Sequence, residues 1–376
     1  MQRFFVFLLF LLSVGTILGQ NAPPISKADS LLKEIEHLQI AQTDFYDKGE
    51  FAILRGKHRR DDNTLFFSSL IGFTLQGLRN DIPKASQVEI DSIVARVVRN
   101  YPSYKNKTGI ATYNFWKTNP AMCFPHSPYL SKRNKYIMPD DADCTALVYL
   151  TDTSIQHANW LKEKLSKHAN LSTTKIKSTY RKYRNLSAYS TWFGKNMPIE
   201  FDLCVQSNVL YWVCENKLPF NKNDSATVHL IKEMVLSGRY LRDAGFVSPS
   251  YKKPSIVLYH LARLLGKFDI AGLSVCRERI KWAIENELTK KNSFMDKVIL
   301  STALIRMGGH PEELQTPANI DKELNDFVFF EADLFSAYTR PCFKFISNQH
   351  WFAIPFRCKA YNLALLMEYE VLKTKP

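Results

Sequence analysis

The chain has 376 residues, and its 50 Lys and Arg outnumber its 36 Asp and Glu, which gives a formal net charge of +14. This length allows one large domain or two ordinary ones, and the positive charge favours anionic surroundings. Seven cysteines in a chain of this size exclude a disulfide-built scaffold, and their odd number leaves at least one thiol unpaired in a monomer.

The first residues have the pattern of an export signal. Arg3 supplies a positive charge, residues 4–18 form an apolar stretch, and Gly19 or Gln20 offers a cleavage point. Because the stretch is too short for a comfortable membrane span, we expect a cleaved signal peptide over 1–20, with an uncleaved signal anchor as the alternative. Nothing later in the sequence is apolar over such a length. The chain is therefore predicted to be a soluble secreted or periplasmic protein.

The rest of the chain has the pattern of helix after helix, with almost no alternating strand pattern. Apolar residues recur at spacings of three and four, which is typical of amphipathic helices. Asp202 and Asp224-Ser225 precede apolar runs as N-caps would, and Gly308 ends one. Helices are predicted over 27–42, 64–79, 87–100, 143–150, 154–168, 203–214, 226–241, 254–265, 272–287, 294–306 and 357–372.

The helices are of two kinds, which indicates two layers. Segment 203–214 is apolar almost all round, and segment 258–265 embeds two polar side chains in apolar surroundings. Helices that are apolar on all sides belong to an inner layer, and amphipathic helices belong to an outer one. No linker divides the chain and no fixed-period repeat supports a solenoid. We therefore predict an all-α protein in which residues 27–374 form an α/α toroid, a ring of helical hairpins, as a single large domain.

The segment "MPDDADCTALVYL" at 138–150 places three carboxyl groups directly before one of the apolar helices. Asp143 would serve as the N-cap of that helix, and Asp140 and Asp141 would favour the positive end of its dipole. One cap explains one aspartate well and three only in part. The same carboxyl groups could instead face a ligand, because the inner helices of a toroid begin at its central cavity.

This segment resembles the acidic motif of class II terpene cyclases, in which Asp-x-Asp-Asp-Thr-Ala opens an inner helix of an α/α toroid. The matching residues run from Asp141 to Ala146, and the resemblance implies that Asp143 is the proton donor. Cys144 stands where the family has its third aspartate, and the chain is about half as long as the two-toroid cyclases. The wider pattern is similar to a group of exported bacterial toroid proteins, in which a Pro-Asp-Asp motif precedes segments similar to "FDLCVQSNVLYWV" and "YKKPSIVLYHLARLL". Carboxyl groups held close together cannot all ionise easily, so their pKa values separate. One of them can then stay protonated, as acid catalysis requires.

Protein prenyltransferases share the toroid and bind zinc through Asp, Cys and His. Asp141, Asp143, Cys144 and His260 are the right residue types here, but two of them are adjacent and no spaced ligand pair appears. We therefore predict no metal and no cofactor. His260 is expected to be a hydrogen-bonded core residue.

Further polar residues within the apolar helices are candidates for the lining of a ligand cavity. Buried polar groups need partners, which other side chains or a ligand would provide. Asp202 and Arg263 are possible partners of the amide side chains. The candidates are Asp202, Gln206, Asn208, Tyr259, His260 and Arg263.

Three functional hypotheses follow. The first is a toroid that binds a small apolar or isoprenoid-like molecule beside Asp140, Asp141 and Asp143. The second is an exported carbohydrate-active hydrolase or lyase, with Asp140 or Asp141 opposed to Asp202, or a Tyr/His/Arg set within "YHLAR" at 259–263 acting on an acidic glycan. The third is a degenerate terpene-cyclase-like enzyme that uses Asp143.

Two basic clusters, "RGKHRR" at 55–60 and "KIKSTYRKYR" at 175–184, suit contact with an anionic envelope surface. The second cluster has a pattern that could bind phosphate-rich ligands, but we expect it to form a solvated helical face. No nucleic-acid-binding motif accompanies either cluster, so a nucleic-acid partner is not expected.

Overall fold

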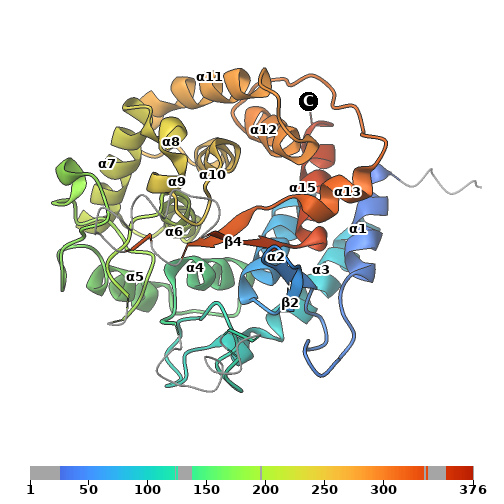
Figure 1. Cartoon of the computed structure of the whole chain (residues 1–376), viewed down its shortest axis with the longest axis horizontal. Helices are drawn as coiled ribbons and strands as arrows, with labels where there is room; N and C mark the ends of the chain where they lie inside the picture. Colours follow the sequence, from blue (N-terminus) through green and yellow to red (C-terminus); the bar gives the residue numbers. More distant parts are fainter. Residues whose placement is uncertain are drawn as a thin grey trace, which may run out of the picture.

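Six helices form a closed inner ring. The computed structural model describes residues 26–122, 124–125, 138–194, 197–333, 336–337 and 353–375. Within these residues the ring follows the order α2, α4, α6, α10, α12 and α15, and α15 packs back against α2 (Figure 1). The bounds are α2 (Leu65–Leu78), α4 (Ala142–Thr151), α6 (Leu203–Glu215), α10 (Pro254–Lys267), α12 (Phe294–Arg306) and α15 (Lys359–Leu372). The predicted all-α class and α/α toroid are confirmed.

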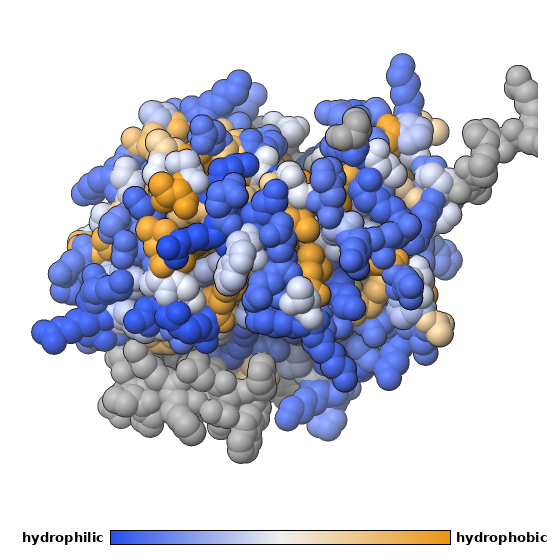
Figure 2. Space-filling model, turned by 90° about the horizontal axis from the view of Figure 1, so that it is seen from above, coloured by the Kyte–Doolittle hydropathy of each residue, from blue (hydrophilic) through white to orange (hydrophobic). Residues whose placement is uncertain are grey.

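A second layer of helices surrounds the ring (Figure 1). It comprises α1 (Lys27–His37), α3 (Lys84–Val98), α5 (Ala158–Lys167), α7 (Lys222–Leu236), α11 (Arg277–Leu288) and α13 (Ile320–Asp326), and the short α8 (Arg239–Arg242) and α9 (Ala244–Val247) connect α7 to α10. All residues of α6 from Leu203 to Val213 are buried, whereas α1 buries only Leu31, Leu32 and Ile35. The outer side seen in Figure 2 is largely hydrophilic. The two helix patterns therefore correspond to the two layers.

A small antiparallel sheet crosses one opening of the ring (Figure 1). Its strands lie in the order β2 (Arg60–Asp62), β1 (Ile53–Arg55), β4 (Ala353–Arg357) and β3 (Phe330–Asp333). The β1–β2 hairpin leads into α2 and β4 leads into α15, so the sheet lies at the end where the inner helices begin. These strands are not predictable from the sequence, because each has only three to five residues, too few to show an alternating pattern.

Most predicted helix bounds lie within a few residues of the observed ones, and the segment 294–306 coincides with α12. Asp202 is the N-cap of α6, as predicted. The predicted cap at Asp224-Ser225 is wrong, because α7 begins at Lys222 with Asn221 as its N-cap. Asp224 instead closes a capping box from inside the first turn.

The basic segment 175–184 does not form the helical face that the sequence analysis predicted. Only Arg181–Tyr183 makes a turn of 3-10 helix, and Ile176 and Tyr183 are buried while most of the basic side chains stay exposed. Hydrogen bonds from the buried side chain of Asn170 to the backbone of Ile176, Arg184 and Leu186 hold the segment as an irregular loop.

The predicted signal peptide over 1–20 lies outside the described residues. Among the residues that are described, no helix combines the length and the apolar character needed to cross a membrane.

Candidate functional site

Asp141 is the residue that caps α4. Its backbone is extended, with φ of −124° and ψ of 156°, and its Oδ1 accepts a hydrogen bond of 2.7 Å from the backbone N–H of Cys144. The prediction that Asp143 caps this helix is therefore wrong, since the helix begins two residues earlier than that cap requires. Burial, together with the neighbouring Asp143 charge, raises the pKa of Asp141 to about 8.

Asp143 does not cap the helix. It lies in the first turn of α4, and its side chain points into the protein. Its Oδ1 accepts a hydrogen bond of 2.6 Å from Asn208 Nδ2 on α6, and its Oδ2 accepts one from the hydroxyl of Tyr251. Only 5% of Asp143 is exposed. Burial raises the pKa of its carboxyl, although these two donors and the positive charge of Arg263 act in the opposite direction.

Arg263 on α10 continues this chain of contacts. Its Nη2 donates to Asn208 Oδ1, so the amide of Asn208 is held between a guanidinium and a carboxyl group. The guanidinium also lies over the rings of Phe73 and Tyr259, with 4.8 Å and 5.4 Å to their centroids. Asn208, Arg263 and Asp143 therefore form one buried network, which we call the Asp143 network. Of the two partners expected for the amides, Arg263 is the one that binds Asn208.

The hydroxyl of Tyr259 binds a carboxyl group other than that of Asp143. Its hydroxyl donates a hydrogen bond of 2.6 Å to Glu368 on α15, which also accepts from Arg306 Nε at 3.0 Å. Glu368 is itself buried. Tyr259 thus contributes the face of its ring to Arg263 and its hydroxyl to a second polar group.

Asp140 and Asp202 bind other parts of the protein. Asp140 accepts hydrogen bonds from the side chains of Asn106 and Thr112, which lie on the preceding loop. Both oxygens of Asp202 are occupied as well: Oδ1 caps α6 through the N–H of Cys204 at 2.9 Å, and Oδ2 accepts from the N–H of Ser250 at 2.9 Å. Burial raises the pKa of Asp202 to about 6. These hydrogen bonds give both carboxyl groups a structural role in holding the protein together.

Three buried polar atoms of the candidate residues have no partner within the described residues. They are His260 Nε2, Arg263 Nη1 and Gln206 Oε1. His260 is a hydrogen-bonded core residue, as expected: its Nδ1 lies 2.9 Å from the carbonyl oxygen of Ile256. Burial and the charge of Arg263 hold the pKa of His260 well below its usual value, so its ring is neutral. Since a carbonyl only accepts, Nδ1 carries the hydrogen and Nε2 is a free acceptor.

Aromatic side chains enclose Tyr251 and His260. This aromatic cluster consists of Phe66, Phe115, Tyr251, Phe329, Phe330 and Phe356. The Tyr251 and His260 ring centroids are 4.7 Å apart, and Phe330 reaches Tyr251 from strand β3 at 5.7 Å. Neither Tyr251 nor Phe330 was predicted from the sequence, because no local pattern distinguishes them from other buried aromatic residues.

A buried ion pair fixes β3 beside this cluster. Lys252 Nζ lies 2.8 Å from Asp333 Oδ2, and the two side chains are 6% and 1% exposed. The backbone N–H of Glu331 also donates to the carbonyl oxygen of Ser250 at 3.1 Å. These contacts hold the sheet against the loop that carries Tyr251.

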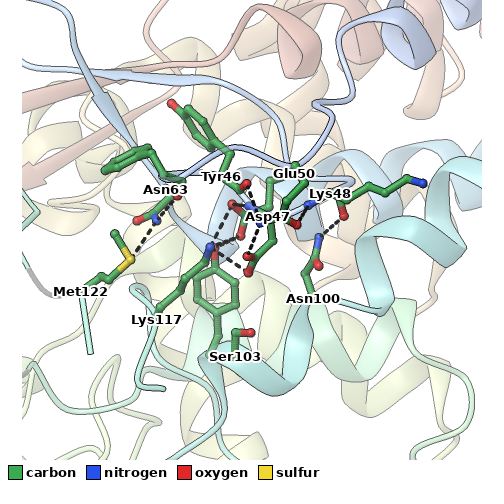
Figure 3. Close-up of polar contacts among 12 residues, drawn as sticks. Tyr46, Asp47, Lys48, Glu50, Asn63, Asn100, Ser103, Lys117 and Met122 are labelled. Atoms are coloured by element: carbon green, nitrogen blue, oxygen red, sulfur yellow. Dashed lines mark hydrogen bonds and ion pairs between the residues drawn. The ribbon is translucent and has the colours of Figure 1, made fainter. Parts of the chain in front are cut away.

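A second buried ionic group lies in the loops before α2 and α4 (Figure 3). Lys117 Nζ lies 3.0 Å from Glu50 and 2.9 Å from Asp47, and Tyr104 donates to Glu50 at 2.6 Å. Burial raises the pKa of Glu50. All these charges have partners, so the group ties two loops together. Within the described residues, no cluster of three or more His, Cys, Asp or Glu side chains could hold a metal ion.

The structure is similar to the type II terpene cyclase MstE from Scytonema. The TM-score is 0.50 at 11% identity, and the alignment covers 92% of this chain and 97% of that chain. An unsaturated glucuronyl hydrolase specific for heparin aligns with a TM-score of 0.45 at 9% identity, over 92% of this chain and 95% of that one. No family model and no curated protein sequence matches the chain. At this identity, the likeness to MstE establishes the toroid fold alone.

Proposed function

We propose that this protein is an exported toroid that binds a small apolar, isoprenoid-like molecule at the end of the ring where Asp143 lies. The observation that carries the proposal is the position of a buried carboxyl group beside an aromatic cluster. Tyr251 belongs to both, since its hydroxyl contacts Asp143 and its ring packs with Phe330. Aromatic side chains offer large apolar contact area, and a single acid among them supplies orientation.

The unpartnered polar atoms indicate which apolar molecule fits. An unsatisfied buried polar atom costs about 1–3 kcal/mol, so such atoms favour a ligand that provides the missing hydrogen bond. His260 Nε2 is a free acceptor inside the aromatic cluster, where it would accept a hydrogen bond from a hydroxyl group. An isoprenoid alcohol combines the apolar body and the hydroxyl that these surroundings favour.

The cyclase-like alternative assigns Asp143 the role of proton donor. Its raised pKa favours the protonated form, and the Tyr251 hydroxyl can accept from a protonated Oδ2 because hydroxyls both donate and accept. Cys144, however, is buried and its pKa is raised well above the usual value, so it is a neutral thiol and supplies no third negative charge. Binding is therefore our leading proposal, and catalysis by Asp143 is the alternative.

The carbohydrate-active alternative has less support. It needs two opposed carboxyl groups that are free to meet a glycan, and Asp140 and Asp202 both bind protein donors. Carbohydrate binding is therefore an alternative outcome of the mass-spectrometry experiment that identifies the natural ligand.

The test is binding of farnesol to the purified protein, measured by isothermal titration calorimetry, with the hydrocarbon farnesene as the matched probe without a hydroxyl. We expect saturable binding of farnesol and a Kd about tenfold or more higher for farnesene, because one buried hydrogen bond is lost. Phe330→Ala should weaken both probes, whereas the exposed Phe220→Ala should leave them unchanged. Binding of neither probe would overturn the proposal.

Mass spectrometry of organic extracts from the protein purified out of its native envelope would identify the natural ligand. We expect a prenyl or sterol-like species in the wild-type extract and less of it with Asp143→Asn. A bound sugar in its place would favour the carbohydrate alternative. Conversion of a polyprene substrate by the wild-type protein but not by Asp143→Asn would favour the cyclase-like one.

A further inference from the structure

A basic cleft lies on the surface, formed by residues outside the Asp143 network. Its volume is about 390 Å³, and its lining consists of Lys175, Ile176, Lys177, Arg181, Arg184 and Asn185. These residues belong to the irregular loop between α5 and α6. A site formed by this cleft is independent of the function proposed above.

The cations of the cleft are not neutralised by the protein. Within the described part of the chain, no ion pair involves Lys175, Lys177, Arg181 or Arg184. Two acids that contact the same loop are engaged by other cations: Glu233 lies 3.3 Å from Lys182, and Asp243, which accepts from Tyr180, lies 3.2 Å from Arg239. Four like charges around one hollow repel each other, and an anion placed between them would relieve that repulsion.

The cleft is held in shape by a buried asparagine. Asn170 is 0% exposed, and its Nδ2 donates to the carbonyl oxygens of Arg184 at 2.9 Å and Leu186 at 2.6 Å. Its Oδ1 accepts from the N–H of Ile176 at 2.7 Å. One amide therefore joins the two stretches of the loop, 175–177 and 181–185, that line the cleft. A site that is already ordered loses little conformational entropy when it binds a ligand.

Arg184 is fixed in the same way, because its Nε donates to the carbonyl oxygen of Thr179 at 3.2 Å. This contact leaves the two terminal nitrogens of the guanidinium available. Guanidinium groups suit the paired oxygens of phosphate, and lysines add charge from several directions. The cleft thus offers two guanidinium groups, two ammonium groups and the side-chain amide of Asn185.

We propose that this cleft binds a phosphate group, either as free phosphate or as the headgroup of an anionic phospholipid. Phosphate fits better than a carboxylate because it presents more oxygens and more negative charge to four separate cations. A lipid phosphate would make the cleft a docking point on an anionic membrane surface.

The test uses two probes on the purified protein. Inorganic phosphate is titrated by calorimetry, and vesicles of phosphatidylcholine with and without phosphatidylglycerol are tested by co-sedimentation. The cleft variant is Lys177→Gln/Arg181→Gln. The matched control is Lys57→Gln/Arg60→Gln, which removes the same charge from an exposed part of the other basic cluster. Both double variants change only exposed side chains, so folding should be retained.

We expect phosphate to bind the wild-type protein and the control alike, and the cleft variant to show a Kd about tenfold or more higher. Vesicle binding that requires phosphatidylglycerol, is lost in the cleft variant and is competed by phosphate identifies a lipid headgroup. Phosphate binding without vesicle binding identifies free phosphate. If neither probe binds, or if the two double variants lose binding equally, the proposed site is wrong.

Discussion

Asn208 and Asp143 meet side chain to side chain, with 2.6 Å between Nδ2 and Oδ1, although 65 residues separate them in the sequence. The contact joins α6 to α4, which are neighbours in the inner ring. Arg263, on a third helix, donates to the oxygen of the same amide. Asn208 therefore links the position of the Arg263 guanidinium group to that of the Asp143 carboxyl group.

Removing this amide should destabilise the fold. We expect Asn208→Ala to lower the free energy of unfolding by about 2–4 kcal/mol, because it leaves a buried carboxyl oxygen and a buried guanidinium without partners. Urea denaturation would measure the loss. Asn216→Ala, at the exposed end of the same helix, should cost about 0.5 kcal/mol or less. Equal losses in the two variants would contradict the role we assign to Asn208.

The buried pair Lys252–Asp333 should contribute more than its neighbour in the sequence. We expect Lys252→Met to lower the free energy of unfolding by about 3 kcal/mol, because it removes the ion-pair partner of a carboxylate that is 1% exposed. Lys253→Met is the matched control and should cost about 1 kcal/mol or less, since Lys253 is 40% exposed in its ion pair with Asp296.

A double variant sharpens this test. Replacing Asp333 by Leu in the Lys252→Met background should recover part of the lost stability, because a buried charge that has lost its lysine is removed. A double variant less stable than the single one would indicate that other contacts of Asp333 dominate.

Stability should fall as the pH rises across the titration of Asp141. Its pKa is about 8 in the folded protein and its ordinary value is 3.8, so the folded state holds a proton that the unfolded state has released between these values. The contribution of this group to stability is complete below pH 3.8 and is lost as the pH rises toward 8, by up to about 1.4 kcal/mol per pH unit.

Asp141→Asn isolates this group, because asparagine caps a helix about as well and does not titrate. Chemical denaturation at several pH values should show the variant gaining stability over the wild type as the pH rises from 5 to 8, a window that lies between 3.8 and 8. A difference between the two proteins that stays constant with pH would show that Asp141 is ionised in the folded state.

Thiol reactivity should follow burial. The five cysteines in the described residues are all free, and burial raises the pKa of Cys358 to about 12 and that of the half-buried Cys214 to about 11. Cys144 and Cys204 are buried with pKa values well above the usual one. We expect iodoacetamide to label Cys214 before these three, because reaction needs an accessible thiolate. Peptide mass spectrometry would locate the label, and urea-unfolded protein provides the fully labelled reference.

Part of the candidate site could be anticipated from local patterns. Asn208 and Arg263 stood out because they are polar within apolar helices, and the structure places both in one network with Asp143. The roles within the acidic motif could not be anticipated, since a shift of two residues in the start of α4 moves the cap from Asp143 to Asp141. Helix bounds are the least certain feature of any pattern, because several polar residues in a row can each cap.

The sequence by itself determined the helices and their two layers, because the spacing and extent of apolar residues are local properties that report burial. Only the tertiary structure decided which polar groups meet. Tyr251 reaches Asp143 across 108 residues, and Phe330 arrives on a strand of four residues that has no pattern of its own. The same holds for the basic segment, where Asn170 and buried Ile176 turn an apparent helical face into a cleft. Such contacts join residues that are far apart in the sequence and meet only when the ring closes. The local spacing of residues does not predict which of them will meet.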